Sequence, residues 1–161
     1  MILGRSRILA LVGGGLIENF STDCLCGAGY DLRAGRIYEL LSGSRLGVAK
    51  RCMPDVKEAV FGTYLLGPNE YVLVETVESV KMPKDLMARI LPRSTIFRCG
   101  CALHTAVVDP GYRGTLTFGL KNLSQHPFTL ESRARVAQIV FETVEGETVE
   151  YDGSYQGGRV T

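Results

Sequence analysis

The sequence predicts an all-β domain, a distorted β-barrel or jelly roll with one short N-terminal helix. Its 161 residues fit a single domain, which we expect to span 1–161. Nineteen glycines and six prolines imply frequent turns. About ten short segments alternate polar and apolar residues at close spacing, which is typical of barrels and jelly rolls.

The first element is a short helix. The apolar run 8–17 is too short to span a bilayer, so no membrane partner is expected. Glycines at 13–15 interrupt the run and favour a helix end there. The pattern predicts an amphipathic helix whose inward-facing residues are Ile8, Leu9 and Leu11.

The remaining elements are strands, turns and one helical turn. Residues 41–60 are of mixed composition and are interpreted as a loop, and 92–97 as a turn and short helix. The turn at 67–70 joins two strands into a predicted hairpin. Residues 151–161 lack periodicity and are expected to form a mobile tail. The predicted strands are 30–33, 36–40, 63–66, 71–77, 86–91, 102–108, 115–122, 128–130 and 135–142.

Charge and cysteine content narrow the class of protein. Lys and Arg total 18 against 17 Asp and Glu, a net charge of +1, so a nucleic acid polymer is not an expected partner. No Cys-x-x-Cys pair occurs among the five cysteines, which argues against structural zinc. We interpret the cysteines as reduced, small core residues of a cytoplasmic protein, and His104 and His126 as structural.

Five segments carry sequence features that a strand pattern alone does not require. They are 27–34 (GAGYDLRA), 91–95 (LPRST), 106–114 (AVVDPGYRG), 135–138 (RVAQ) and 151–158 (YDGSYQGG). Together and in this order they resemble the dUTPase and dCTP deaminase superfamily. The opening 1–20 and the tail resemble the deaminase branch, so the resemblance covers nearly the whole chain. The best match is the archaeal-type dUTPase, which implies a β-clip-type fold, a homotrimer, and Mg²⁺ as cofactor.

The second segment points to phosphate binding. Arg93 and Ser94 follow Pro92, and a guanidinium, a hydroxyl and free backbone amides at a helix start form a phosphate cradle. The same residues taken alone would equally cap a helix. The resemblance favours phosphate binding, to which Thr95 belongs, and matches Arg98 to an arginine of the deaminase site.

Asp109 ends an apolar strand and precedes Pro-Gly, where Asp commonly starts a turn. The resemblance implies that Asp109 orients the water that attacks the α-phosphorus of dUTP, which releases dUMP and pyrophosphate. It implies that Gln138 helps to hold this water or the α-phosphate. Without the motif, Gln138 would be an ordinary polar strand residue.

The resemblance assigns the other contacts of the nucleotide. Tyr112 would stack on the deoxyribose and exclude a 2′-hydroxyl, although it also fits a core tyrosine. The uracil would be read by the backbone around Ala106 and Val108. Asp31 would contact Mg²⁺ through water, with the triphosphate carrying most of the metal's ligands. The tail would form a flap over the ligand through Tyr155, Gln156 and Arg159, and Tyr151 is a further expected substrate contact.

One difference from the deaminase pattern distinguishes dUTP hydrolysis from dCTP deamination as the expected activity. The deaminase branch has a glutamate ten positions after the aspartate that matches Asp109, where this chain has Gly119. A glycine cannot shuttle a proton, so the sequence predicts a dUTP diphosphatase. A dCTP deaminase or a bifunctional enzyme remains the alternative, supported by Arg98. A non-catalytic nucleotide-binding regulator on the same scaffold is the third reading.

Overall fold

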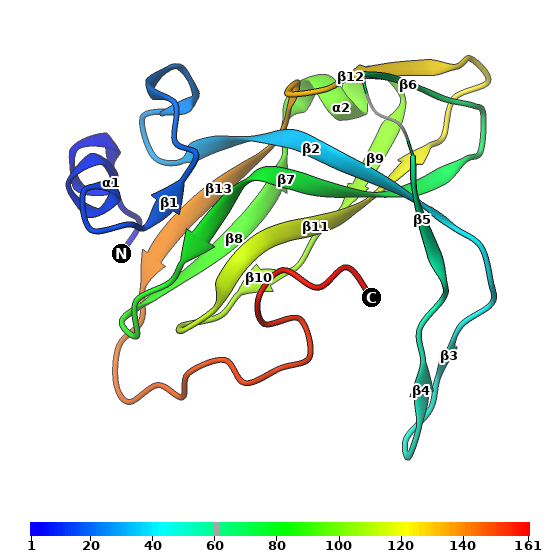
Figure 1. Cartoon of the computed structure of the whole chain (residues 1–161). Helices are drawn as coiled ribbons and strands as arrows, with labels where there is room; N and C mark the ends of the chain where they lie inside the picture. The colour runs from blue at the N-terminus through cyan, green and yellow to red at the C-terminus, as the bar shows by residue number, and fades with distance from the viewer. Residues whose placement is uncertain (60–61) are drawn as a thin grey trace.

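The computed structural model describes residues 1–59 and 62–161 (Figure 1). Strands are the main secondary structure, with a helix at the N-terminus and another beside β9, as the sequence predicts. The elements are α1 (Arg5–Val12), β1 (Ile17–Glu18), the 3-10 turn η1 (Thr22–Cys24), β2 (Tyr30–Leu40), β3 (Arg45–Leu46), β4 (Arg51–Cys52), β5 (Val56–Ala59), β6 (Thr63–Leu66), β7 (Tyr71–Lys81), β8 (Leu86–Pro92), α2 (Ser94–Arg98), β9 (Cys101–His104), β10 (Val107–Val108), β11 (Arg113–Asn122), β12 (Phe128–Glu131) and β13 (Arg135–Thr143).

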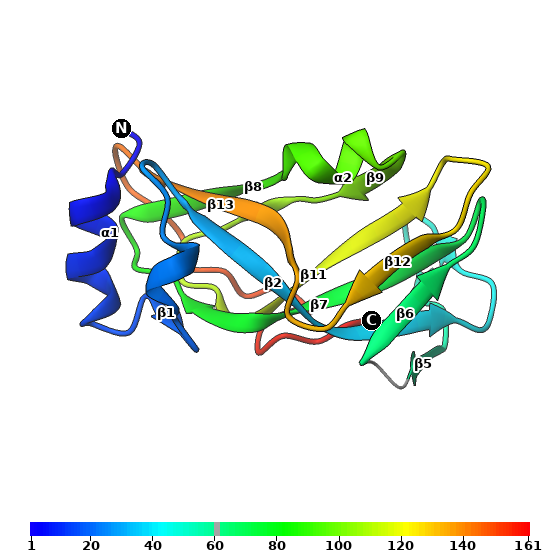
Figure 2. The same cartoon turned by 90° about the horizontal axis from the view of Figure 1, so that it is seen from above.

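One curled antiparallel sheet dominates the fold, in the order β10-β8-β13-β2-β7-β11-β9. β1 is added to β7, and β5 is added to β2. The long strand β2 changes partner along its length, because residues 30–33 pair with β13 and residues 34–39 pair with β7. This change curls the sheet into an incomplete barrel (Figure 2), which confirms the predicted all-β class.

A buried carboxylate sits where β2 turns from one neighbour to the other. Glu78 on β7 is fully buried, and its Oε1 accepts hydrogen bonds from Arg33 Nε (2.6 Å) and the Tyr30 hydroxyl (3.1 Å). Its Oε2 accepts the backbone N–H of Arg33 (2.9 Å). The Glu78 side chain therefore supplies the acceptor that a continued β-ladder would have supplied.

The N-terminal helix forms as predicted, with one error in its inward face. Ile8 is fully buried and Leu11 is half-buried, whereas Leu9 is 48% exposed. Residues three apart share a helix face, but consecutive residues lie about 100° apart, so Leu9 turns away from Ile8. Among the described residues, no helix is long and apolar enough to cross a membrane.

The predicted hairpin of 63–66 and 71–77 is wrong. The turn closes, since Glu70 N–H donates to the Gly67 carbonyl (3.1 Å), but β6 pairs with β12 instead of β7. Both edges of β7 are already occupied by β2 and β11, so β6 has no free edge there. The buried Asn122 side chain fixes the alternative, donating to the carbonyls of Leu66 (3.0 Å) and His126 (2.8 Å).

Three other segments differ from their predicted extent. The strands expected at 30–33 and 36–40 form one strand with a bulge at Gly35, where a Cβ would meet the Thr76 backbone at 2.8 Å. The single strand expected at 102–108 is divided into β9, which pairs with β11, and β10, which pairs with β8. Each piece follows a different neighbour in the curled sheet, so the strand breaks between them.

The loop expected at 41–60 contains three short strands, and its last position lies outside the described residues. β3 and β4 pair with each other and form an arm that extends away from the sheet (Figure 1). The five thiols are free, but only Cys24 and Cys101 are buried. The interpretation of the cysteines as core residues is therefore wrong for Cys52 and Cys99, which are exposed.

We expect Arg33→Ala to destabilise the fold by about 3–5 kcal/mol, because it leaves the buried Glu78 carboxylate without its cation. Arg36→Ala is the matched control, since Arg36 pairs with Glu58 at 3.8 Å with both side chains more than half exposed, and it should cost less than about 1 kcal/mol. Urea unfolding of the two variants measures the difference. Equal losses would show that Glu78 does not hold the junction.

Candidate active site

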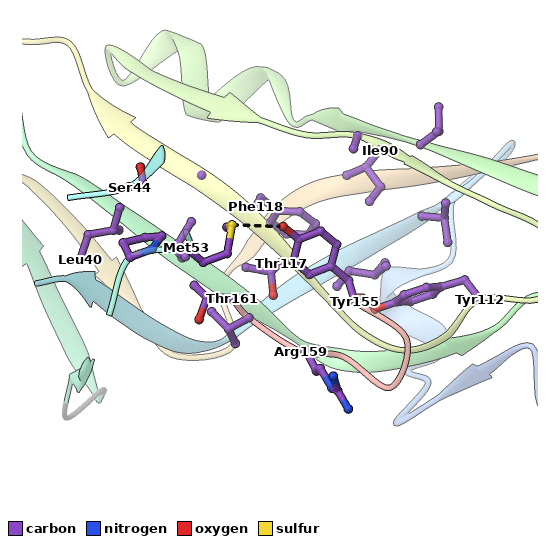
Figure 3. Close-up of a pocket in the computed structure, with 18 of the residues that line it drawn as sticks. Leu40, Ser44, Met53, Ile90, Tyr112, Thr117, Phe118, Tyr155, Arg159 and Thr161 are labelled. Carbon is purple, nitrogen blue, oxygen red and sulfur yellow. Dashed lines mark hydrogen bonds between the residues drawn. The ribbon is translucent and has the colours of Figure 1, made fainter. Parts of the chain in front are cut away.

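A pocket of about 450 Å³ opens on one face of the curled sheet (Figure 3). Apolar and aromatic side chains form most of its wall, as is common for small-molecule sites. The tail of the chain closes one side of it. The lining residues are Leu40, Ser44, Met53, Pro54, Tyr71, Leu73, Ile90, Ala106, Val107, Val108, Asp109, Tyr112, Leu116, Thr117, Phe118, Gly119, Tyr151, Tyr155, Arg159, Val160 and Thr161.

Asp109 lies at the pocket wall directly after β10, and its side chain is exposed. Its backbone carbonyl accepts the Tyr112 N–H (3.2 Å), which closes the turn that the sequence predicts. No ion pair engages the Asp109 carboxylate within the described residues. The carboxylate is thus free to accept a proton or to orient a water molecule.

Tyr112 is 8% exposed and belongs both to the pocket and to the core. Its hydroxyl donates to the Thr115 carbonyl (2.5 Å), and its ring meets Tyr151 edge-on with centroids 5.5 Å apart. Burial raises the pKa of Tyr112 to about 12. The residue is therefore a neutral ring near neutral pH, and its burial agrees with the interpretation of Tyr112 as a core tyrosine. Its contact with a deoxyribose stays a prediction.

The tail packs along the turn that follows β10. Tyr151 N–H donates to the Pro110 carbonyl (2.8 Å), and Tyr151 and Tyr155 reach the pocket. Gln156 does not, because its Oε1 accepts the Arg113 N–H (2.8 Å) and its Nε2 donates to the Gly111 and Tyr151 carbonyls (both 3.1 Å).

The arm formed by β3 and β4 holds the middle of the tail. The guanidinium of Arg51 lies over the Tyr155 ring, 5.6 Å from its centroid, and hydrogen-bonds the Ser154 hydroxyl. The Tyr155 hydroxyl contacts the Met53 sulfur (3.8 Å), the dashed line in Figure 3. The tail therefore contacts strand β4 through Arg51 and the segment directly after β4 through Met53.

The expected phosphate-binding residues form a second cluster outside this pocket. Arg93 Nε lies 3.1 Å from Asp31 Oδ2, and Arg135 Nη1 lies 3.5 Å from the same oxygen. Gln138 stands opposite Asp31 in the pairing of β13 with β2. The structure thus brings Arg93, Asp31 and Gln138 together, but not with Asp109.

The rest of the expected phosphate site lies on α2. Ser94, Thr95 and Arg98 are exposed on this short helix, which starts directly after Arg93. The Arg98 guanidinium lies over the ring of its neighbour Phe97, 5.8 Å from the centroid. These side chains are therefore available on the surface, next to the Asp31 cluster.

The surroundings of Asp31 do not fit the predicted contact with Mg²⁺ through water. Its carboxylate is 5% exposed and already engaged by two guanidiniums, which repel a cation. In the described part of the chain, no group of three or more His, Cys, Asp or Glu side chains is placed to hold a metal ion.

Tyr71 and Thr117 also line the pocket, although no sequence motif singles them out. A Cβ built on Gly119 would overlap the Tyr71 hydroxyl and lie 2.6 and 2.8 Å from ring carbons of Tyr71. The Thr117 hydroxyl oxygen is buried and, within the described residues, has no hydrogen-bond partner. Nothing in the strand patterns marks either residue, because only the pairing of β7 with β11 shows that they share a pocket.

The amino-acid sequence matches a known protein family and several of its members. Residues 2–144 match the model of the dCTP deaminase-like family. The chain is 41% identical over 143 residues to a dCTP deaminase of Pyrococcus horikoshii, covering 88% of this chain and 85% of the relative. It is 36% identical over 157 residues to a probable deoxyuridine 5′-triphosphate nucleotidohydrolase of Aeropyrum pernix, covering 96% of both chains.

A solved structure shares the fold. The 2′-deoxycytidine 5′-triphosphate deaminase from Agrobacterium tumefaciens superposes with a TM-score of 0.69 at 20% identity. The match covers 87% of this chain and 48% of the Agrobacterium chain.

We expect removal of residues 151–161 to lower enzymatic turnover at least about tenfold while the free energy of unfolding changes by no more than about 1 kcal/mol. The tail closes one side of the pocket, and its side-chain hydrogen bonds are exposed or only partly buried. Initial rates and urea unfolding of the full and shortened chains test this. A shortened chain with the normal turnover rate would contradict the flap role.

Proposed function

Because this chain belongs to the dCTP deaminase-like family, we propose that it is a dUTP diphosphatase. It would hydrolyse dUTP to dUMP and pyrophosphate. The observation that carries the proposal is the pocket in which Asp109 has a free carboxylate while Gly119, covered by Tyr71, has no acid to offer. Such a pocket has a base for water and lacks the proton shuttle that removal of an amine requires.

In the proposed reaction Asp109 takes a proton from a water molecule while the water oxygen bonds to the α-phosphorus. The bond between the α-phosphorus and the bridging oxygen breaks, and pyrophosphate leaves with that oxygen. The protein contributes mainly position and charge, as in other phosphoryl transfers. Tyr112 would pack on the deoxyribose, and the backbone of Ala106 and Val108 would read the uracil.

The phosphates would lie on the second cluster, with Arg93, Ser94, Thr95 and Arg98 as donors and Gln138 beside the α-phosphate. Since this cluster lies outside the pocket that contains Asp109, the complete site would require a neighbouring subunit. Exposed apolar side chains next to α2 and β9 support such an interface: Phe97 is 58% exposed and Leu123 is 64% exposed. We therefore propose a homotrimer, as the family resemblance implies.

The alternative reading, a dCTP deaminase or bifunctional enzyme, is favoured by one observation. Glu75 on β7 is buried and stands opposite Thr117 in the pairing with β11, so an acid lies one strand away from Gly119. Its Oε2 accepts a hydrogen bond from the Tyr38 hydroxyl (2.7 Å), and it does not line the pocket. A non-catalytic regulator would bind dUTP and release no pyrophosphate.

Asp109→Asn should lower kcat for dUTP by about 10²–10⁴-fold and leave the affinity for dUMP within about threefold, because it removes a base and keeps its shape. The measurement is pyrophosphate release together with equilibrium binding. Asp85→Asn, at an exposed turn before β8, is the control and should behave as the unmodified chain. An Asp109→Asn variant with near-normal turnover would exclude Asp109 as the base.

dCTP should be deaminated at less than about 1% of the rate of dUTP hydrolysis, since a missing acid–base group costs about 10²–10⁴-fold. Ammonia release from dCTP and pyrophosphate release from dUTP, measured on the same preparation, give the ratio. Robust ammonia release would make the deaminase reading the better one and direct attention to Glu75 and Arg98.

A further inference from the structure

In the part of the pocket around Gly119, the Tyr71 ring packs against the glycine, and this contact takes no part in the proposed hydrolysis step. Gly119 is enclosed by its own sheet, because it stands opposite Leu73 of β7 and His104 of β9. The space that a side chain at this position would occupy is filled by the Tyr71 ring, which comes from β7. The glycine and the tyrosine therefore form one packing unit across two strands.

A second polar group lies next to this unit. Thr117 is two residues from Gly119 on β11, so both face the same side of the sheet. Its Oγ1 is the buried side-chain oxygen that lacks a hydrogen-bond partner within the described residues, and Thr117 is among the pocket residues in Figure 3. A buried hydroxyl without a partner is unusual in a native protein. It marks the place where a polar ligand atom would complete the site.

Tyr71 presents its own hydroxyl at the same end of the pocket. It is 38% exposed, and its ring centroid lies 6.1 Å from that of His104. Burial raises the pKa of Tyr71 above its usual value, so its hydroxyl remains protonated near neutral pH. Two neutral hydroxyls that both donate and accept suit the edge of a pyrimidine, which alternates carbonyl oxygens with a ring N–H.

We infer that Tyr71 and Thr117 are specificity-determining residues, whose hydroxyls bind the edge of the pyrimidine while the Tyr71 ring occupies the space of a side chain at position 119. This inference rests on the proposed function, because it takes the pocket to be the nucleoside site. Gly119 and Tyr71 are coupled, since a larger residue at 119 is incompatible with the tyrosine. The ring also leaves no room for a carboxylate and its water beside the base.

The hydroxyls are tested by equilibrium binding of dUMP to the full chain, which requires no turnover. Thr117→Val and Tyr71→Phe should each weaken dUMP binding about 3–10-fold, the loss expected for one hydrogen bond. Thr129→Val on the exposed face of β12 and Tyr64→Phe, whose hydroxyl bonds Glu39 (3.1 Å) outside the pocket, should not change binding. Equal affinities for all four variants would overturn the inference.

The packing unit is tested by a pair of variants. Gly119→Glu should weaken dUMP binding at least about 30-fold, and Tyr71→Ala/Gly119→Glu should recover the steric part of this loss, because the second change vacates the space, and should bind about 3–10-fold more weakly than the unmodified chain for want of the Tyr71 hydroxyl. Thermal unfolding checks that each variant is folded, and the Thr117→Val and Tyr71→Phe results apply even if Gly119→Glu is not. A Gly119→Glu variant that binds like the unmodified chain, or a double variant that regains nothing, would contradict the coupling.

The outcomes separate the two proposals. A chain that binds dUMP with the predicted variant pattern but releases no pyrophosphate from dUTP would refute the diphosphatase and support the inference. A chain that hydrolyses dUTP while Tyr71→Phe and Thr117→Val match their controls would do the reverse. If the unmodified chain does not bind dUMP, the pocket is not a nucleoside site and the inference is wrong.

Discussion

The curl of the sheet depends on the buried Glu78 carboxylate. At this point β2 leaves β7 for β13, and a departing strand normally exposes backbone donors that must find other acceptors. Glu78 accepts both the backbone N–H and the guanidinium of Arg33 and, in addition, the hydroxyl of Tyr30. Because a buried charge without its partners is strongly destabilising, this cluster permits one path for β2 and so fixes the angle between the two halves of the sheet.

The pocket follows from that angle and from a bulge on the other side of β7. The pairing of β11 with β7 shifts between Thr115 and Thr117, and the Thr76 hydroxyl accepts the Leu116 N–H (2.9 Å) at the shift. Thr76 also donates to the Glu78 carbonyl (2.6 Å), so the junction and the bulge share one residue. The positions of Thr117 and Gly119 are thus tied to the same short stretch of β7 that holds β2.

Local sequence signals predicted many of the secondary-structure elements. They failed where the pairing or packing of a strand depends on another strand that is distant in the sequence. The helix at the N-terminus, the strands and the turn after Val108 follow from periodicity and from Gly and Pro, which act over a few residues. The pairing of β6 with β12 could not be predicted in this way, because it depends on whether an edge of β7 is free. The contact between Tyr71 and Gly119 could not be predicted for the same reason. The segment around Tyr71 has the pattern of an ordinary apolar strand, and Gly119 lies 48 positions later in the sequence.

The family resemblance assigned roles to individual residues but did not predict the electrostatic surroundings in which the structure places them. Asp31 matches a metal-binding acid in sequence, yet two guanidiniums engage it here, and the cluster of Asp31, Arg93 and Arg135 carries a net positive charge. The pocket that contains Asp109 is mostly apolar, and the Asp109 carboxylate forms no ion pair within the described residues. In the proposed function, these two environments suit the two ends of a nucleotide, the anionic phosphates and the flat, weakly polar nucleoside. Since one chain keeps them apart, the proposed assembly places the α-phosphate at the boundary between a positive surface of one subunit and the Asp109 carboxylate of another, which is where a water molecule must lose its proton and attack an anion.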